Sequence, residues 1–93
     1  MKPLIAEYLK KDALVIDVRS PQEYARGHFS GSTNIPLNVL SSRLAALDRK
    51  RPTIVCCASG TRSAAAIGIL KSNGFESVIN AGPWTNALNA SAL

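Results

Sequence analysis

Two short runs of apolar residues constrain the fold of this chain most strongly. Residues 13–18 read Ala-Leu-Val-Ile-Asp-Val, and residues 53–56 read Thr-Ile-Val-Cys. Both runs are nearly unbroken and rich in β-branched residues, which is typical of strands that are buried on both faces. Such strands belong to parallel sheets, so the sequence predicts a parallel sheet that is covered on both sides.

Segments with helical patterns alternate with the strands. The second of them has a clear beginning, because Ser20 is an N-cap residue, Pro21 occupies the first helical position and Glu23 completes a capping box. This alternation predicts an α/β fold with a mostly parallel central sheet and helices on both faces. We expect helices over residues 4–10, 21–27, 37–47, 62–71 and 84–93, further short strands over 34–36 and 77–80, and a turn over 81–83.

Length and charge narrow the range of partners. A chain of 93 residues is expected to form one domain over residues 1–93. Its net charge of +5 raises the concentration of anions near the surface. The basic residues are mostly scattered, however, and only one Trp, two Tyr and two Phe could stack on bases. We therefore expect small anions as partners and no nucleic acid.

The apolar runs are short. None approaches the roughly 18 residues that a membrane-spanning helix needs, and the N-terminal residues lack the long uncharged stretch of a signal peptide. We expect a cytoplasmic protein without a membrane partner, or a periplasmic one if a signal has been removed.

The two cysteines, Cys56 and Cys57, are neighbours, which disfavours a disulfide framework because a bond between adjacent residues is strained. A single histidine and no separated pair of cysteines argue against a zinc site, so we expect no metal and no cofactor. We expect Cys56 to end a core strand as a small apolar residue. Cys57 stands where the strand meets a loop, and Gly60 and Arg62 follow it, which favours a chemical role.

The segment from Cys57 to Ser63 is the candidate active loop. It follows a buried strand and precedes a helix, and in open α/β sheets ligands bind at the carboxyl ends of the strands. A thiol at a helix N-terminus is favoured in its thiolate form. Small residues allow several backbone N–H groups to converge on one atom, and Gly60 supplies the freedom in φ that such a curl needs. The small residues are Ala58, Ser59, Thr61 and Ser63.

Arg62 requires a negative partner. A cation at the beginning of a helix is unfavourable beside the helix dipole, so we expect the thiolate, its adduct or an acid such as Asp17 to hold it. Asp17 and Arg19 lie close together at the end of the first strand. We expect them either to order the loop or to pair with one another.

Two spacings of cysteine and arginine compete. Four residues separate Cys57 from Arg62, and five separate Cys56 from Arg62. The longer spacing is the minimal signature of cysteine phosphatases, whose loop surrounds a phosphoryl group. The shorter spacing makes a tighter ring, which suits a smaller target such as the outer sulfur of a persulfide.

Residues 57–63 resemble the active loop of rhodanese-like sulfurtransferases, in which a cysteine begins and an arginine ends a six-residue loop. Other segments resemble the family in the same order, and the similarity extends roughly from residue 13 to residue 84. The chain departs from the family at Phe29, Ser30, Ser32 and Pro83. The other matching segments are 15–24, 27–36, 74–75 and 80–82.

The resemblance implies a thiosulfate sulfurtransferase with a rhodanese-like fold. In this family Cys57 would take the outer sulfur of thiosulfate or a similar small anionic donor as a persulfide. It would then pass the sulfur to cyanide or another thiophilic acceptor, such as a thiol or a protein. Inward N–H groups from Ala58 to Ser63 would stabilise both anions. Arg62 would either attract the donor or brace the loop through Asp17.

The same resemblance places His28 in a structural signature, and Trp84 is expected to serve in packing. Two other functions compete with sulfur transfer. A cysteine phosphatase or arsenate reductase would use Cys56 and the longer spacing, but Val55 stands where such enzymes usually have a histidine. A non-catalytic interaction module would form no persulfide, and such relatives commonly lack the cysteine.

Overall fold

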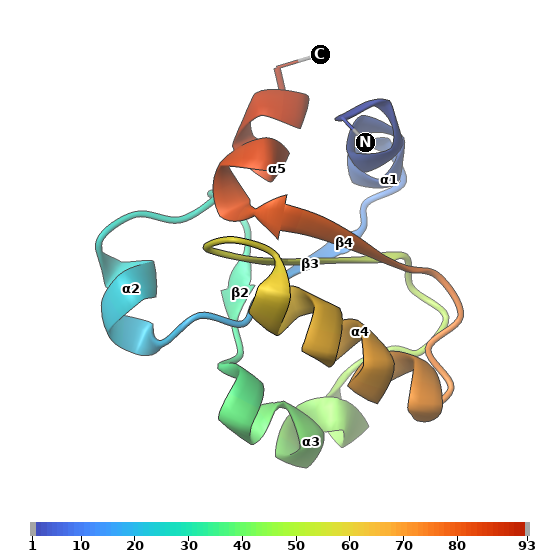
Figure 1. Cartoon of the computed structure of the whole chain (residues 1–93). Coiled ribbons are helices and arrows are strands. Elements are labelled where there is room, and N and C mark those ends of the chain that lie inside the picture. Colours follow the sequence, from blue (N-terminus) through green and yellow to red (C-terminus); the bar gives the residue numbers. More distant parts are fainter. Residues whose placement is uncertain (1, 93) are drawn as a thin grey trace.

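The computed structural model describes residues 2–92, and its centre is a four-stranded sheet (Figure 1). The strands lie in the order β2-β1-β3-β4, and all neighbouring pairs are parallel. The two apolar runs form the two central strands, as the sequence predicts. The strands are β1 (Leu14–Asp17), β2 (Thr33–Asn34), β3 (Thr53–Cys57) and β4 (Val78–Pro83).

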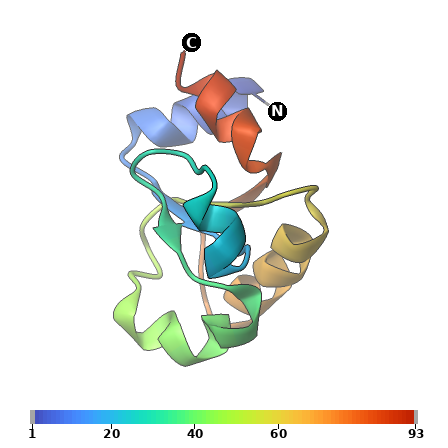
Figure 2. The same ribbon diagram turned by 90° about the vertical axis from the view of Figure 1, so that its left-hand side faces the viewer.

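Helices cover both faces of the sheet, which confirms the predicted α/β class. In Figure 1, α1 (Lys2–Lys10) and α5 (Trp84–Ala90) lie above the sheet, whereas α3 (Leu40–Arg43) and α4 (Thr61–Ser72) lie below it. The short helix α2 (Pro21–Ala25) lies at the end of the sheet where the strands terminate, and Figure 2 shows it in front, between the two helical layers.

Alternation along β3 sends its two cysteines to opposite faces, because successive side chains of a strand point to opposite sides. Ile54 and Cys56 belong to the core cluster under α1 and α5, together with Ile5. Val55 and Cys57 belong to the other cluster, under α3 and α4. Of the two cysteines, Cys57 therefore shares a layer with α4.

Parallel pairing brings the ends of the strands together. Asp17 at the end of β1 lies opposite Cys56, and Asn34 at the end of β2 lies opposite Asp17. On the other side of β3, Cys56 pairs with Gly82 and Cys57 with Pro83, because a bulge shifts the register after Val55. Residues that follow the strands consequently meet at one edge.

Four of the expected boundaries are wrong. The segment 37–47 is not one helix: α3 is flanked by two 3-10 turns, η1 (Leu37–Val39) and η2 (Leu44–Ala46), and none of the three has a side-chain cap. The expected strand 34–36 ends at Asn34. The expected turn 81–83 lies in β4, because Gly82 and Pro83 pair with Cys56 and Cys57 beyond the bulge. The closing helix ends at Ala90, and Leu93 lies outside the described residues.

A buried ion pair joins the end of β1 to α2. Arg19 donates from Nη2 to Asp17 at 2.7 Å, and from Nε to both carboxylate oxygens at 3.0 Å. The same Nη2 donates to the Gly27 carbonyl at 2.7 Å. Of the two expectations for Asp17 and Arg19, the structure shows the mutual pair.

Within residues 2–92, no helix is long and apolar enough to cross a membrane.

Replacing Asp17 by alanine should lower the free energy of unfolding by about 3–5 kcal/mol, because Arg19 would keep a buried charge without its partner. Urea unfolding measures this change. The matched control is Glu7→Ala, which removes an exposed pair with Lys11 that is worth only about 0.5 kcal/mol. Equal losses in the two variants would contradict the assigned role of the buried pair.

Candidate functional site

The loop between β3 and α4 curls at Gly60. This residue has a φ of 104°, in the left-handed region that favours glycine. A Cβ atom at this position would also lie 3.4 Å from the Gly82 Cα atom of β4. Gly60 therefore adopts a backbone conformation that other residues rarely adopt, as the sequence predicts. The loop lies directly against the end of β4.

The curl turns hydrogen-bond donors toward Cys57. The Gly60 N–H donates to the Cys57 Sγ atom at 2.9 Å, and the Ser63 hydroxyl lies 3.4 Å from the same sulfur. Burial raises the pKa of the Cys57 thiol. The Ser63 hydroxyl and the N–H groups of Ser63, Gly60 and Ser59 outweigh this effect, so the pKa of Cys57 lies below its ordinary value.

The Ser63 hydroxyl has one proton and several acceptors. Its oxygen lies 2.6 Å from Asn80 Oδ1 and 3.1 Å from the Gly60 carbonyl, in addition to the Cys57 sulfur. When Cys57 is a thiol, its own S–H can donate to Ser63 Oγ. When Cys57 is a thiolate, the hydroxyl can donate to the sulfur only if its proton turns away from Asn80 Oδ1. The backbone N–H of Gly60 donates without such a rearrangement.

Asn80 is a site residue that the sequence analysis missed. Its Oδ1 accepts from Ser63 and from the Gly82 N–H at 2.8 Å, and its Nδ2 donates to the Gly60 carbonyl at 3.2 Å. Asn80 thus holds both residues that contact the Cys57 sulfur. It lies 17 residues from Ser63 in the chain, so no local pattern could have indicated this contact.

The partner of Arg62 is Glu23. Of the expected partners, which were the thiolate, its adduct or an acid such as Asp17, the structure shows an acid, but a different one. Arg62 donates from Nη1 and Nη2 to the two carboxylate oxygens of Glu23, at 2.6 and 2.9 Å. Asp17 is unsuited to this role because Arg19 already occupies both of its oxygens. The pair between Glu23 and Arg62 therefore links the beginning of α4 to α2.

Glu23 has two roles in the structure. Its carboxylate accepts the Ser20 N–H in the capping box of α2, as the sequence predicts, and it also binds Arg62. The hydrogen bonds from Arg62 and Ser20 lower the pKa of Glu23 to about 2. The side chain therefore carries its negative charge at neutral pH and neutralises the guanidinium.

Cys56 lies in a different environment. It is fully buried on the face covered by α1 and α5. Burial raises the pKa of its thiol to about 12, and the neighbouring Asp17 contributes in the same direction. Cys56 thus has the character of a small core residue.

Cys57 is also fully buried, with no exposed surface. Its sulfur faces the donors of the loop, but the closed loop leaves no path from solvent. Ala58, Ser59 and Thr61 are exposed on the outside, where the Ser59 hydroxyl lies 3.4 Å from that of Thr61. A reagent can reach the sulfur only when this segment moves.

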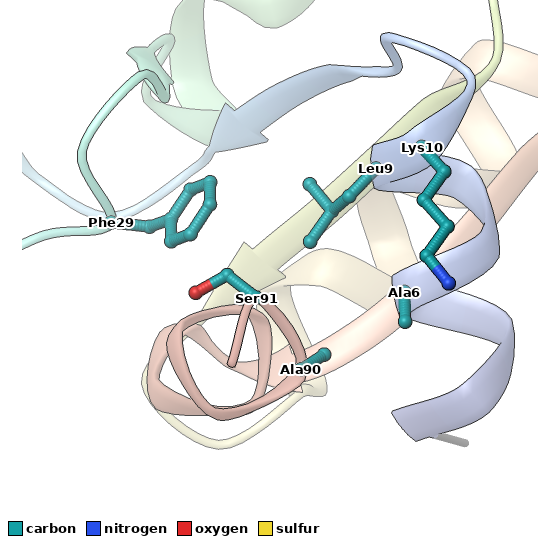
Figure 3. Close-up of a pocket in the computed structure, with 6 residues that line it drawn as sticks. All are labelled: Ala6, Leu9, Lys10, Phe29, Ala90 and Ser91. Carbon is teal, nitrogen blue, oxygen red and sulfur yellow. The ribbon is translucent and has the colours of Figure 1, made fainter. Parts of the chain in front are cut away.

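Neither His28 nor the hollow drawn in Figure 3 belongs to the loop. His28 is exposed and stacks on Tyr24, with ring centroids 3.8 Å apart. The hollow lies between α1, α5 and the segment that carries Phe29, whose ring points toward Leu9 (Figure 3). Its remaining lining residues are Ala6, Lys10, Ala90 and Ser91.

The sequence model of one protein family, the rhodanese-like domain, matches residues 3–83, which is most of the chain. This protein belongs to the rhodanese-like family. A thiosulfate sulfurtransferase GlpE of Pseudomonas fluorescens is 38% identical over 69 residues, which cover 74% of this chain and 63% of that relative. The chain thus spans less than two thirds of that protein's length.

Solved structures of the rhodanese-like family agree with the fold. A rhodanese with anions from E. coli is 37% identical, with a TM-score of 0.75 over 80% of this chain and 89% of that one. A human single-domain sulfurtransferase is 28% identical, with a TM-score of 0.81 over 94% of this chain and 91% of that one. The rhodanese-like fold implied by the sequence resemblance is therefore confirmed.

Replacing Ser63 by alanine should raise the pKa of the Cys57 thiol, because the thiolate loses one charge-assisted hydrogen bond. The ultraviolet absorbance of the thiolate, followed against pH in a Cys56→Ala background, measures this pKa. Ser59→Ala is the control, since it keeps the backbone N–H and should leave the midpoint unchanged. An unchanged midpoint in Ser63→Ala would contradict the assigned role.

Proposed function

We propose that this protein is a sulfurtransferase that carries sulfur as a persulfide on Cys57. The observation that carries the proposal is the 2.9 Å contact from the Gly60 N–H to the Cys57 sulfur, at the carboxyl edge of a parallel sheet. A fixed backbone donor stabilises negative charge on this sulfur. The nucleophile then needs no general base, because it reacts as the thiolate.

Each half of the reaction moves one sulfur atom. The Cys57 thiolate attacks the outer sulfur of thiosulfate, a new S–S bond forms, and the old S–S bond breaks with its electron pair leaving on sulfite. The enzyme now carries a persulfide anion. In the second half an acceptor such as cyanide attacks the outer sulfur and leaves as thiocyanate, which restores the thiolate. The relatives named thiosulfate sulfurtransferases support thiosulfate as the donor.

In this scheme Arg62 has a structural role, which is to hold the end of the loop against α2. The two hydrogen bonds with Glu23 neutralise its charge and direct it toward α2. Of the two roles that the resemblance implies for Arg62, this pairing supports the ordering of the loop, through Glu23 instead of Asp17. Ala58, Ser59, Gly60, Thr61 and Ser63 form the rest of the loop, and its movement admits the donor.

No observation favours a phosphatase or an arsenate reductase. Such an enzyme would use Cys56, which lies on the opposite face of the sheet from α4 and whose pKa is raised to about 12. A thiol in that state is a poor nucleophile at neutral pH. A non-catalytic module would have no need of a thiol whose pKa is lowered by hydrogen bonds from its own loop.

Cys57→Ser should abolish sulfur transfer from thiosulfate, because the hydroxyl cannot form a persulfide. Cys56→Ser should retain most of the activity, provided that the buried hydroxyl does not unfold the protein, which circular dichroism checks. Mass spectrometry after incubation with thiosulfate should show one added sulfur atom on Cys57. Sulfur on Cys56, or none on either cysteine, would reject the proposal.

A further inference from the structure

We propose that Asn80 favours the sulfur-loaded form of the enzyme over the free thiolate, because it holds the hydroxyl proton of Ser63 whenever the Cys57 Sγ atom carries no charge. Asn80 is thus a positioning residue that acts on the sulfur through Ser63. The hold on the proton follows from the hydrogen bonds of the site alone. The effect on sulfur loading also rests on the proposed function.

Two backbone groups fix the orientation of the Asn80 amide. The Gly82 N–H donates at 2.8 Å to one atom of the amide, which must therefore be the oxygen. The Gly60 carbonyl oxygen lies 3.2 Å from the other atom, which must be the nitrogen, because two acceptors cannot share a hydrogen bond. A flipped amide would lose both bonds, so Oδ1 is the atom that faces Ser63.

This orientation decides the direction of the bond between Ser63 and Asn80. Ser63 Oγ lies 2.6 Å from Asn80 Oδ1, and an amide oxygen has no proton, so the hydroxyl is the donor. A hydroxyl has a single proton and therefore has none left for the Cys57 sulfur, 3.4 Å away. The sulfur is then the donor in that contact, which describes the thiol form of Cys57.

Ionisation of Cys57 breaks this arrangement. The sulfur becomes an acceptor, and the Ser63 hydroxyl can donate to it only by giving up its other bonds. The bond to Asn80 Oδ1, at 2.6 Å, is shorter than the contact with the Gly60 carbonyl, at 3.1 Å. Asn80 is therefore the main competitor for the proton, and Ser63 stabilises the free thiolate less than it would without Asn80.

Formation of the persulfide reverses the change. The negative charge then lies on the outer sulfur, and the Cys57 Sγ atom becomes a neutral bridging sulfur, which is a weak acceptor. The Ser63 proton returns to Asn80 Oδ1. No further reactant is needed, since a thiolate and thiosulfate become a persulfide anion and sulfite while the hydroxyl only turns. Asn80 therefore shifts the equilibrium of this half-reaction toward the loaded enzyme.

The titratable groups packed around Cys57 do not take part in this exchange. They come from the end of β1, from α2, from β3 and from the beginning of α4, and the charged ones are joined in two ion pairs. β4 carries no titratable side chain, and the rest of the core around Cys57 is apolar. Within residues 2–92, none of these groups is hydrogen-bonded to the side chain of Ser63 or Asn80. The groups are Asp17, Arg19, Glu23, Cys56 and Arg62.

A double-mutant cycle tests the hold on the proton. The pKa of Cys57 is measured from the thiolate absorbance, in a Cys56→Ala background, for Asn80→Ala with Ser63 present and with Ser63→Ala. A general loosening of the loop acts in both backgrounds and cancels. The remaining difference should be a downward shift in pKa, equivalent to an increase of about two- to fivefold in the ionisation constant, the size of one exchanged hydrogen bond.

Two further variants guard the cycle against a structural explanation. Asn86→Ala is the matched control, because Asn86 donates at 2.8 Å to the Ala81 carbonyl of the same strand and does not contact Ser63. It should show no difference between the two backgrounds. Asn80→Leu removes the oxygen and keeps most of the volume of the side chain. It should repeat the downward shift, and it replaces Asn80→Ala if circular dichroism shows that the alanine variant is unfolded.

The effect on loading is measured by mass spectrometry at fixed ratios of thiosulfate to sulfite. With Ser63 present, Asn80→Ala should lower the ratio of persulfide to free Cys57 about two- to fivefold more than it does with Ser63→Ala. An upward or absent pKa difference would overturn the hold on the proton, and a downward one with unchanged loading would overturn the effect on the equilibrium. A downward pKa difference without persulfide in any variant would support the hold on the proton and reject the proposed function.

Discussion

Gly60 bends the backbone after β3 so that its own N–H points back at the Cys57 sulfur, 2.9 Å away. This hydrogen bond depends on a positive φ and on the close approach of the loop to Gly82. Asn80 holds the carbonyl of Gly60 and the hydroxyl of Ser63 from β4. A backbone turn therefore places a hydrogen-bond donor against the sulfur, and the parallel sheet fixes that turn in place.

Ion pairs with carboxylates neutralise the two arginines nearest the loop, Arg19 and Arg62. Glu23 caps α2, and its carboxylate also binds Arg62, which lies 39 residues further along the sequence. Asp17 binds Arg19, which lies two residues away in the chain. With both arginines paired, these two ion pairs hold α2 and the beginning of α4 in place.

The parts of this structure that could be predicted from the sequence depend on local signals. The β-branched runs identify the central strands, and the capping box of Ser20 marks the beginning of α2. Contacts between distant segments carry no such signal. The sequence analysis named Asp17 as one possible partner of Arg62, although Arg19 occupies it, and it placed Asn80 in a strand without assigning it to the site. The burial of Cys57 also depends on how the loop packs, which residue order alone does not indicate.

The central claim is that the loop holds an anionic sulfur on Cys57. A crystal structure of the protein after incubation with thiosulfate tests this claim most directly. The account predicts an additional sulfur atom bonded to the Cys57 Sγ atom, with its negative charge facing the backbone N–H groups of the loop. An additional sulfur on Cys56, or an outer sulfur on Cys57 that points away from every N–H group of residues 58–63, would contradict it.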